Sequence, residues 1–146
     1  MADKKTGRAI WRDDLMFTGI SGTGFTVPLD AAKTAGGHGT GVGPMDLLLV
    51  ALAGCTGMDV ISILRKKQQD ITGFEVQVEG LRADEHPRTW KEIWVKFVVT
   101  GHNVDPAAVE RAIELSRDKY CGVSATLKPI TAMNYSQEII EAEPEA

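Results

Sequence analysis

The sequence predicts an α+β fold in which antiparallel sheets are wrapped around one long apolar helix. The first indication is a nearly continuous apolar stretch from Pro44 to about Lys67, which has the length of a helix rather than of a strand. The second is a set of short runs with alternating apolar and polar residues on both sides of that stretch. With 146 residues, the chain has a common size for one domain, and we expect residues 1–146 to form a single domain.

The segment from Gly7 to Leu29 is expected to form an antiparallel meander. Its apolar runs are interrupted by turn-forming sequences at 13–14 and 21–24. The next segment, 35–43, contains five glycines in nine residues, which is typical of a linker or of a loop whose backbone closely approaches another group. This segment matches neither a P-loop nor a dinucleotide-binding motif, so nucleotide binding is disfavoured.

The apolar stretch is predicted to be a helix of about 36 Å, at 1.5 Å per residue. Pro44 suits the first helical position, and Asp46 near the start and Arg65 near the end complement the helix dipole. Asp59 and several small or polar residues favour a buried core helix over a membrane span. Because the helix is apolar on nearly all sides, one chain of this size can hardly cover it, and we expect a homodimer.

The second half of the chain is expected to contain a hairpin, a helix, a short helical turn and a last strand. Asp105 and Pro106 are typical of a helix start. The expected bounds are 74–78 and 93–99 for the hairpin strands, 82–88 for their connection, 105–119 for the helix, 121–127 for the turn and 130–140 for the last strand. The acidic tail, 141–146, is expected to be frayed.

Composition excludes several classes of function. A formal net charge of -4 and a pI near 5.4 provide no basic surface for nucleic acid. The N-terminal sequence does not have the pattern of a secretory signal, so we expect a cytoplasmic protein that does not bind membranes. Two cysteines are too few for a disulfide scaffold and do not form a metal-binding pair, so any role they have is expected to be as thiols.

Cys55 and Cys121 are the candidate catalytic residues. Cys55 lies within the long helix beside Gly54 and Gly57, which would let a ligand or another backbone approach the sulfur. Cys121 precedes a helical turn whose free N–H groups would favour its thiolate. Each cysteine could instead be a buried structural residue. Together they suit a peroxidatic thiolate, which is oxidised to sulfenic acid, and a resolving thiol, which forms a disulfide with it.

Asp59 and His38 are possible supporting residues. Cys55, Asp59 and Ser62 form a polar stripe on one helix face, and Asp59 would raise the pKa of a nearby thiol. A structural role, in which Asp59 accepts a hydrogen bond from a neighbouring segment, is at least as well favoured. His38 lies in the glycine-rich loop, and the histidines match no zinc-binding spacing, so we expect no metal.

Three segments resemble the OsmC/Ohr hydroperoxide-reductase superfamily. They are Gly-Pro-Met-Asp-Leu-Leu at 43–48, Ala-Gly-Cys-Thr-Gly-Met-Asp-Val-Ile-Ser-Ile-Leu at 53–64 and Lys-Tyr-Cys-Gly-Val-Ser at 119–124. The resemblance extends to the order of elements over nearly the whole chain. It implies an intertwined homodimer that reduces organic hydroperoxides without a metal or organic cofactor and is recycled by dithiol reductants. Cys55 would then be the peroxidatic residue and Cys121 the resolving residue.

The chain departs from the superfamily around the thiolate. Well-studied peroxidases of this group use an Arg to stabilise the thiolate and a Glu, ten residues before the cysteine, to hold that Arg. Here the matching position is Met45, and Arg8, Arg12 or His38 could supply the cation. The helix that contains Asp59 resembles a less characterised branch of the superfamily.

Two functions therefore remain open. The first is a thiol-dependent organic hydroperoxide reductase. The second is a non-catalytic protein that binds a hydrophobic small molecule at the dimer interface and whose thiols are inert or redox-sensing.

Overall fold

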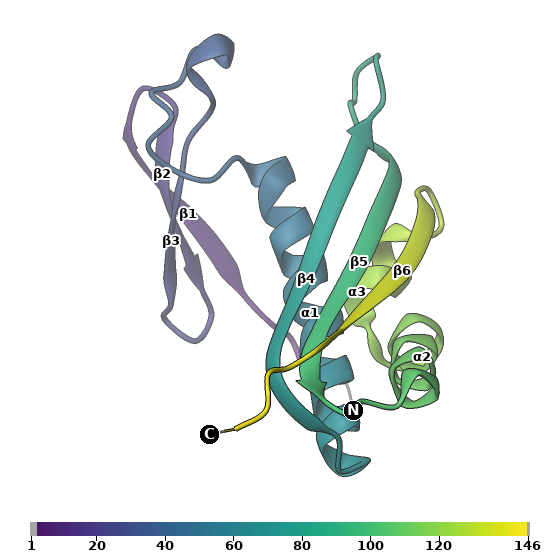
Figure 1. Cartoon of the computed structure of the whole chain (residues 1–146). Coiled ribbons are helices and arrows are strands. Elements are labelled where there is room, and N and C mark those ends of the chain that lie inside the picture. Colours follow the sequence, from purple (N-terminus) through teal and green to yellow (C-terminus); the bar gives the residue numbers. More distant parts are fainter. Residues whose placement is uncertain (1–2, 146) are drawn as a thin grey trace. The chain divides into compact units, whose positions relative to one another are not determined.

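The computed structural model describes residues 3–145, which form two compact units. The first unit ends at Leu48 and the second begins at Leu49, so that the boundary falls near the start of the long helix. Figure 1 shows a small sheet in the first unit and a longer sheet with accompanying helices in the second. The α+β class is as the sequence predicts.

The first unit contains the expected antiparallel meander. Its strands are β1 (Gly7–Asp13), β2 (Met16–Ser21) and β3 (Thr26–Leu29), in the order β1-β2-β3. A short 3-10 helix, Lys33–Ala35, precedes the glycine-rich loop. Gly41 explains part of the glycine content, because a Cβ there would lie 2.7 Å from the Pro28 carbonyl oxygen. The loop is therefore one whose backbone packs closely against β3.

The long helix, α1 (Pro44–Lys66), begins at Pro44 as predicted. Within one chain only a single stripe of α1 is buried, and 28% of its most apolar 18-residue window is covered. Val50 and Met58 are 59% and 74% exposed. Its length and composition would also allow α1 to cross a membrane, a property that the core helix of a soluble protein shares. The buried stripe consists of Leu52, Thr56, Gly57, Val60 and Leu64.

The second unit is built on a three-stranded sheet. Its strands are β4 (Asp70–Arg82), β5 (Trp90–His102) and β6 (Ala132–Glu141), in the order β4-β5-β6. The predicted hairpin is confirmed, since β4 and β5 are antiparallel. In contrast to a purely antiparallel sheet, β6 is parallel to β5, because the segment between them is a helical crossover that returns the chain to the same end of the sheet. The buried face of β5 carries Ile93, Val95, Phe97 and Val99.

The helical crossover has three parts. Helix α2 (Pro106–Leu115) is capped by Asp105, whose Oδ1 accepts a hydrogen bond of 3.0 Å from the Ala107 N–H. The predicted helix continues to Tyr120, but its last part, Ser116–Tyr120, is a π-helical turn. Helix α3 (Gly122–Leu127) follows directly.

The start of the acidic tail is held in place, although the sequence predicts fraying over 141–146. The Ala142 N–H donates to the Gly101 carbonyl over 2.7 Å, and a ring nitrogen of His102 lies 3.0 Å from the Glu143 carbonyl. The tail is ordered this far because its backbone groups find partners at the end of β5. Ala146 lies outside the described residues.

Candidate thiol site

Cys55 lies on α1 and is half-buried within its own chain. The two glycines beside it have different environments. A Cβ at Gly57 would lie 3.3 Å from a methyl group of Val76, so this glycine allows α1 to pack closely on β4. A Cβ at Gly54 would have no neighbour within 4 Å. The side of α1 at Gly54 is therefore the open one.

Cys121 is buried and forms the N-cap of α3. Its Sγ accepts a hydrogen bond of 3.3 Å from the Ser124 N–H, as the sequence led us to expect of a cysteine before a helical turn. Burial nevertheless raises the pKa of Cys121 to about 11, against the lowering effect of the Ser124 N–H, and the nearby Cys55 and Asp59 raise it further. Burial therefore has a larger effect on the pKa of Cys121 than the start of the helix has, and Cys121 is a protonated thiol near neutral pH.

The two cysteines are brought close together in the second unit. Strands β4 and β5 lie between them in the sequence. In the folded chain, a side-chain hydrogen bond with Cys55 and the charge of Cys55 nevertheless contribute to raising the pKa of Cys121. Both are free thiols in the structure. Their arrangement suits a pair that alternates between two thiols and a disulfide.

Asp59 is part of a short chain of hydrogen bonds between α1 and the π-helical turn. Ser116 Oγ donates to Asp59 Oδ2 over 2.9 Å, and Thr56 Oγ1 lies 2.7 Å from Ser116 Oγ. Ser116 is fully buried and Thr56 is 2% exposed. The hydrogen bond from a neighbouring segment is the contact that a structural role of Asp59 requires. The roles of Thr56 and Ser116 are not visible in the sequence, because nothing in it links positions so far apart.

A second polar cluster is linked to Cys121 through Ser124. Ser124 Oγ is 3.0 Å from the Tyr135 hydroxyl, and the Arg117 guanidinium lies 5.7 Å from the centre of the Tyr135 ring. Arg117 also forms an ion pair of 2.8 Å with Asp118. Burial raises the pKa of Tyr135 in spite of its hydrogen bond with Ser124. Sequence reasoning missed Arg117 and Tyr135, since an Arg in a helix and a Tyr in a strand have no distinctive pattern.

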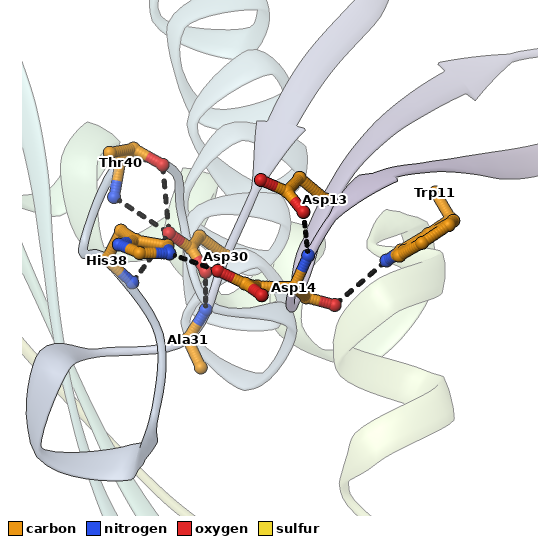
Figure 2. A network of polar contacts seen from close by, with 7 residues as sticks. All are labelled: Trp11, Asp13, Asp14, Asp30, Ala31, His38 and Thr40. Carbon is orange, nitrogen blue, oxygen red and sulfur yellow. Dashed lines mark hydrogen bonds and ion pairs between the residues drawn. The ribbon is translucent and has the colours of Figure 1, made fainter.

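The remaining candidates, Arg12 and His38, belong to the first unit and contact groups of that unit. Arg12 Nε donates to Thr18 Oγ1 over 2.9 Å across the β1–β2 hairpin, at the surface. His38 Nε2 lies 2.6 Å from Asp14 Oδ2, as Figure 2 shows. This contact and the charge of Asp14 raise the pKa of His38.

Asp30 organises the glycine-rich loop that carries His38. Its carboxylate is 2% exposed and accepts four hydrogen bonds, from the N–H groups of Ala31, His38 and Thr40 and from the Thr40 hydroxyl. Figure 2 shows these donors gathered around it. Burial works to raise the pKa of Asp30, but the hydrogen bonds, those from Thr40 first, lower it to about 2. Sequence reasoning missed Asp30, whose only signal was an acidic residue between a strand and a glycine-rich loop.

The structure shows no group of three His, Cys, Asp or Glu side chains that could hold a metal ion within residues 3–145. The candidate reactive groups of the second unit are the two thiols, with hydroxyl and carboxylate groups near them.

Comparisons with known proteins agree with this fold. The family model described as OsmC-like protein matches residues 37–136. The chain is 37% identical over 136 residues to protein YhfA of Escherichia coli strain K12, covering 92% of this chain and 98% of that protein. The chain therefore belongs to the OsmC-like family.

Solved structures show the same fold. A hypothetical protein from Aquifex aeolicus is 32% identical with a TM-score of 0.85, covering 97% of this chain and 100% of that chain. An OsmC-like protein from Mycoplasma pneumoniae is 21% identical with a TM-score of 0.81, covering 96% and 99%. An organic hydroperoxide resistance protein from Legionella pneumophila is 12% identical with a TM-score of 0.70, covering 94% and 98%. The last two similarities concern the fold alone.

Proposed function

We propose that this protein reduces organic hydroperoxides through its cysteine pair, with Cys55 as the peroxidatic thiolate and Cys121 as the resolving thiol. The observation that carries the proposal is the proximity of two free thiols from α1 and from the start of α3. Family membership supports a peroxide-related redox role. The distant structural relative named as an organic hydroperoxide resistance protein is consistent with it.

The proposed reaction has two chemical steps and a recycling step. The Cys55 thiolate attacks the O–O bond of the hydroperoxide, and the sulfur is oxidised to sulfenic acid as the alkoxide leaves and is protonated to the alcohol. The Cys121 sulfur then attacks the Cys55 sulfur, and a disulfide and water are formed. A dithiol reductant restores both thiols by exchange. No organic cofactor or metal takes part.

We propose that the active form is a cytoplasmic homodimer. OsmC-family proteins are typically homodimers, and the exposed apolar side chains Val50 and Met58 of α1 would be covered by a second copy. The reducing conditions of the cytoplasm would keep both cysteines free. Light scattering should give about twice the 15.8 kDa mass of the chain, and Met58→Asp should give the monomer. A wild-type monomer at micromolar concentration would contradict this assembly.

Turnover measurements test the proposed reaction. Wild type should consume cumene hydroperoxide in the presence of a dithiol, and faster than hydrogen peroxide, because apolar residues beside Cys55 would add binding energy for an alkyl group at about 25 cal/mol per Å². Cys55→Ser should be inactive. Cys121→Ser should lose turnover with a dithiol but still become oxidised once at Cys55. Equal activity of wild type and Cys55→Ser would refute the assignment.

A second candidate function is the binding of a hydrophobic small molecule without catalysis. It is favoured by a surface depression of about 530 Å³ on α1, lined by Met58, Ile61, Ser62, Arg65 and Lys66. An apolar ligand with an acidic end would suit this combination of apolar and basic groups. A fluorescent fatty acid, titrated against wild type and Lys66→Glu, which removes a basic group of the depression, tests it. Micromolar binding by a wild-type protein that does not react with hydroperoxides would favour this function over the first.

A further inference from the structure

The resolving step of the proposed reaction needs a proton acceptor. With a pKa of about 11, only about one Cys121 molecule in ten thousand is a thiolate at pH 7, and the thiolate is the form that attacks sulfur. The departing hydroxide, in turn, needs a proton. A group that accepts the first proton and supplies the second would accelerate the step by general acid–base catalysis.

Asp59 is placed to be that group. It lies one helical turn after Cys55 on the same face of α1. Its partner Ser116 also accepts, at its backbone carbonyl, a hydrogen bond of 2.8 Å from the Cys121 N–H, and the negative charge of Asp59 raises the pKa of Cys121. Asp59 is only partly buried. Its Oδ2 accepts one hydrogen bond from Ser116, and among residues 3–145 its Oδ1 has no hydrogen-bond partner and its carboxylate has no ion pair. One carboxylate oxygen therefore remains available to a proton.

Ser116 and Thr56 are positioning residues for this carboxylate. A serine hydroxyl has one proton, and Ser116 donates it to Asp59. In the contact of 2.7 Å between the two hydroxyls, Thr56 is then the donor and Ser116 the acceptor. The chain of bonds runs in one direction and ends at the carboxylate, and its members strengthen one another in a buried site. The π-helical turn brings Ser116 to α1, and such turns are frequent at functional sites.

The other titratable groups around Cys121 are less suited to accept its proton. Tyr135 on β6 has a raised pKa because it is buried, so it stays protonated. Arg117 in the π-helical turn is already paired with Asp118. Cys55 is the other reacting atom. Asp59 is the carboxylate whose charge raises the pKa of the Cys121 thiol.

We propose that Asp59, oriented by Ser116 and Thr56, takes the Cys121 proton as this sulfur attacks the oxidised Cys55 and passes it to the departing hydroxide. The S–H bond of Cys121 and the S–O bond of Cys55 break, one S–S bond forms, and water leaves. No further oxidant or reductant is needed, since the sulfenic acid is the oxidant. This inference rests on the hydroperoxide reduction proposed above.

The variant Asp59→Asn tests this proton transfer, which we call the relay. The Asn amide oxygen still accepts a hydrogen bond from Ser116, while the proton acceptor is lost. A brief pulse of cumene hydroperoxide is followed by quenching and by mass spectrometry of sulfenic acid and disulfide. Disulfide formation at pH 7 should be at least about tenfold slower than in wild type and should recover about tenfold per pH unit. Asp84→Asn, which changes an exposed carboxylate in the β4–β5 connection, should match wild type.

A purely electrostatic role of Asp59 predicts the opposite result. If Asp59 acted only through its charge, which raises the pKa of Cys121, Asp59→Asn would increase the thiolate fraction and accelerate disulfide formation. An equal or faster rate in Asp59→Asn therefore overturns the relay. Formation of the Cys55 sulfenic acid, measured in Cys121→Ser with and without Asp59→Asn, should be similar in the two proteins.

A second substrate separates this inference from the proposed function. Ellman's reagent converts Cys55 to a mixed disulfide, and attack by Cys121 then releases a second thionitrobenzoate without any hydroperoxide. Asp59→Asn should slow this second release by a similar factor. If Cys55 does not react with cumene hydroperoxide but the second release is slowed, the peroxidase function fails, while Asp59 is still supported as the acceptor of the Cys121 proton. If the second release is not slowed, the relay fails whatever the hydroperoxide does.

Discussion

Each unit contains a carboxylate that accepts hydrogen bonds, and the two differ in the number and kind of their donors. Asp30 in the first unit accepts four hydrogen bonds, three of them from backbone N–H groups. Asp59 in the second unit accepts one, from a side-chain hydroxyl. The hydrogen bonds lower the pKa of Asp30 to about 2, so it is ionised near neutral pH.

The difference separates a carboxylate that shapes a loop from the one that we propose as a proton acceptor. Backbone donors around Asp30 fix the path of the glycine-rich loop, and three of the four hydrogen bonds converge on Oδ2. The single donor to Asp59 orients the carboxylate without saturating it, and two thiols lie nearby. We therefore expect the number of donors to distinguish the proposed proton acceptor from a structural carboxylate.

The largest expected effect concerns the cooperativity with which the whole chain unfolds. The length of 146 residues predicts one domain, so the two units should unfold together in a single calorimetric transition. Two resolved transitions, each abolished by a substitution in one unit, would show that the regions are separate domains and that each carboxylate acts on its own unit alone.

Asp30→Ala should lower the melting temperature the most among the carboxylate variants. The reason is that the donors of Ala31, His38 and Thr40 lose their common acceptor. Since the folded pKa, about 2, is below the ordinary 3.8, the stabilisation by Asp30 is present above pH 3.8 and is lost as the pH falls towards 2. Thermal unfolding of wild type and Asp30→Ala should therefore converge in acid. A constant difference from pH 7 to pH 2 would show that Asp30 is not the acceptor we describe.

Ser116→Ala should have a moderate effect on stability. It leaves the Thr56 hydroxyl and the Asp59 carboxylate without their shared partner, which is expected to cost about 1–3 kcal/mol of unfolding free energy. Urea denaturation measures this cost. In the double variant Thr56→Val, Ser116→Ala the two effects should not add, because the residues belong to one hydrogen-bond chain. Additive effects would mean that the chain is not formed in solution.

The smallest effect is expected at the surface pair of His38 and Asp14. Because the folded pKa of His38 is raised above 6.5, the pair contributes stability that is complete below pH 6.5 and is lost as the pH rises through the folded value. In Asp14→Asn, an NMR titration should find the pKa of His38 lower than in wild type. An unchanged titration would show that the contact of 2.6 Å is not maintained in solution.

Local signals predicted much of the fold. The starts of α1 and α2 were predictable because Pro44 and the Asp105-Pro106 pair act within one turn of the helix. The parallel pairing of β6 was not, because the alternation of a strand does not specify its partner. The sequence likewise predicts helix beyond Leu115 but not the π-helical turn that presents Ser116.

The site was predictable in part, and by a different route. Cys55 and Cys121 were identified from a resemblance, and Asp59 from its spacing to Cys55 on one helix. Contacts between distant segments, such as Thr56 with Ser116 and Ser124 with Tyr135, depend on tertiary packing and leave no trace in one sequence. The catalytic assignment of the cysteines and the supporting roles of Arg12 and His38 remain predictions.

The pairing of Cys55 with Cys121 is the central claim, and the intact mass after oxidation tests it most directly. One equivalent of cumene hydroperoxide should convert the wild-type protein to a form two hydrogens lighter with no titratable thiol, and a digest should contain one disulfide-linked peptide pair that joins Cys55 to Cys121. An unchanged mass with both thiols still titratable would contradict the account, as would a disulfide that links two copies of Cys55.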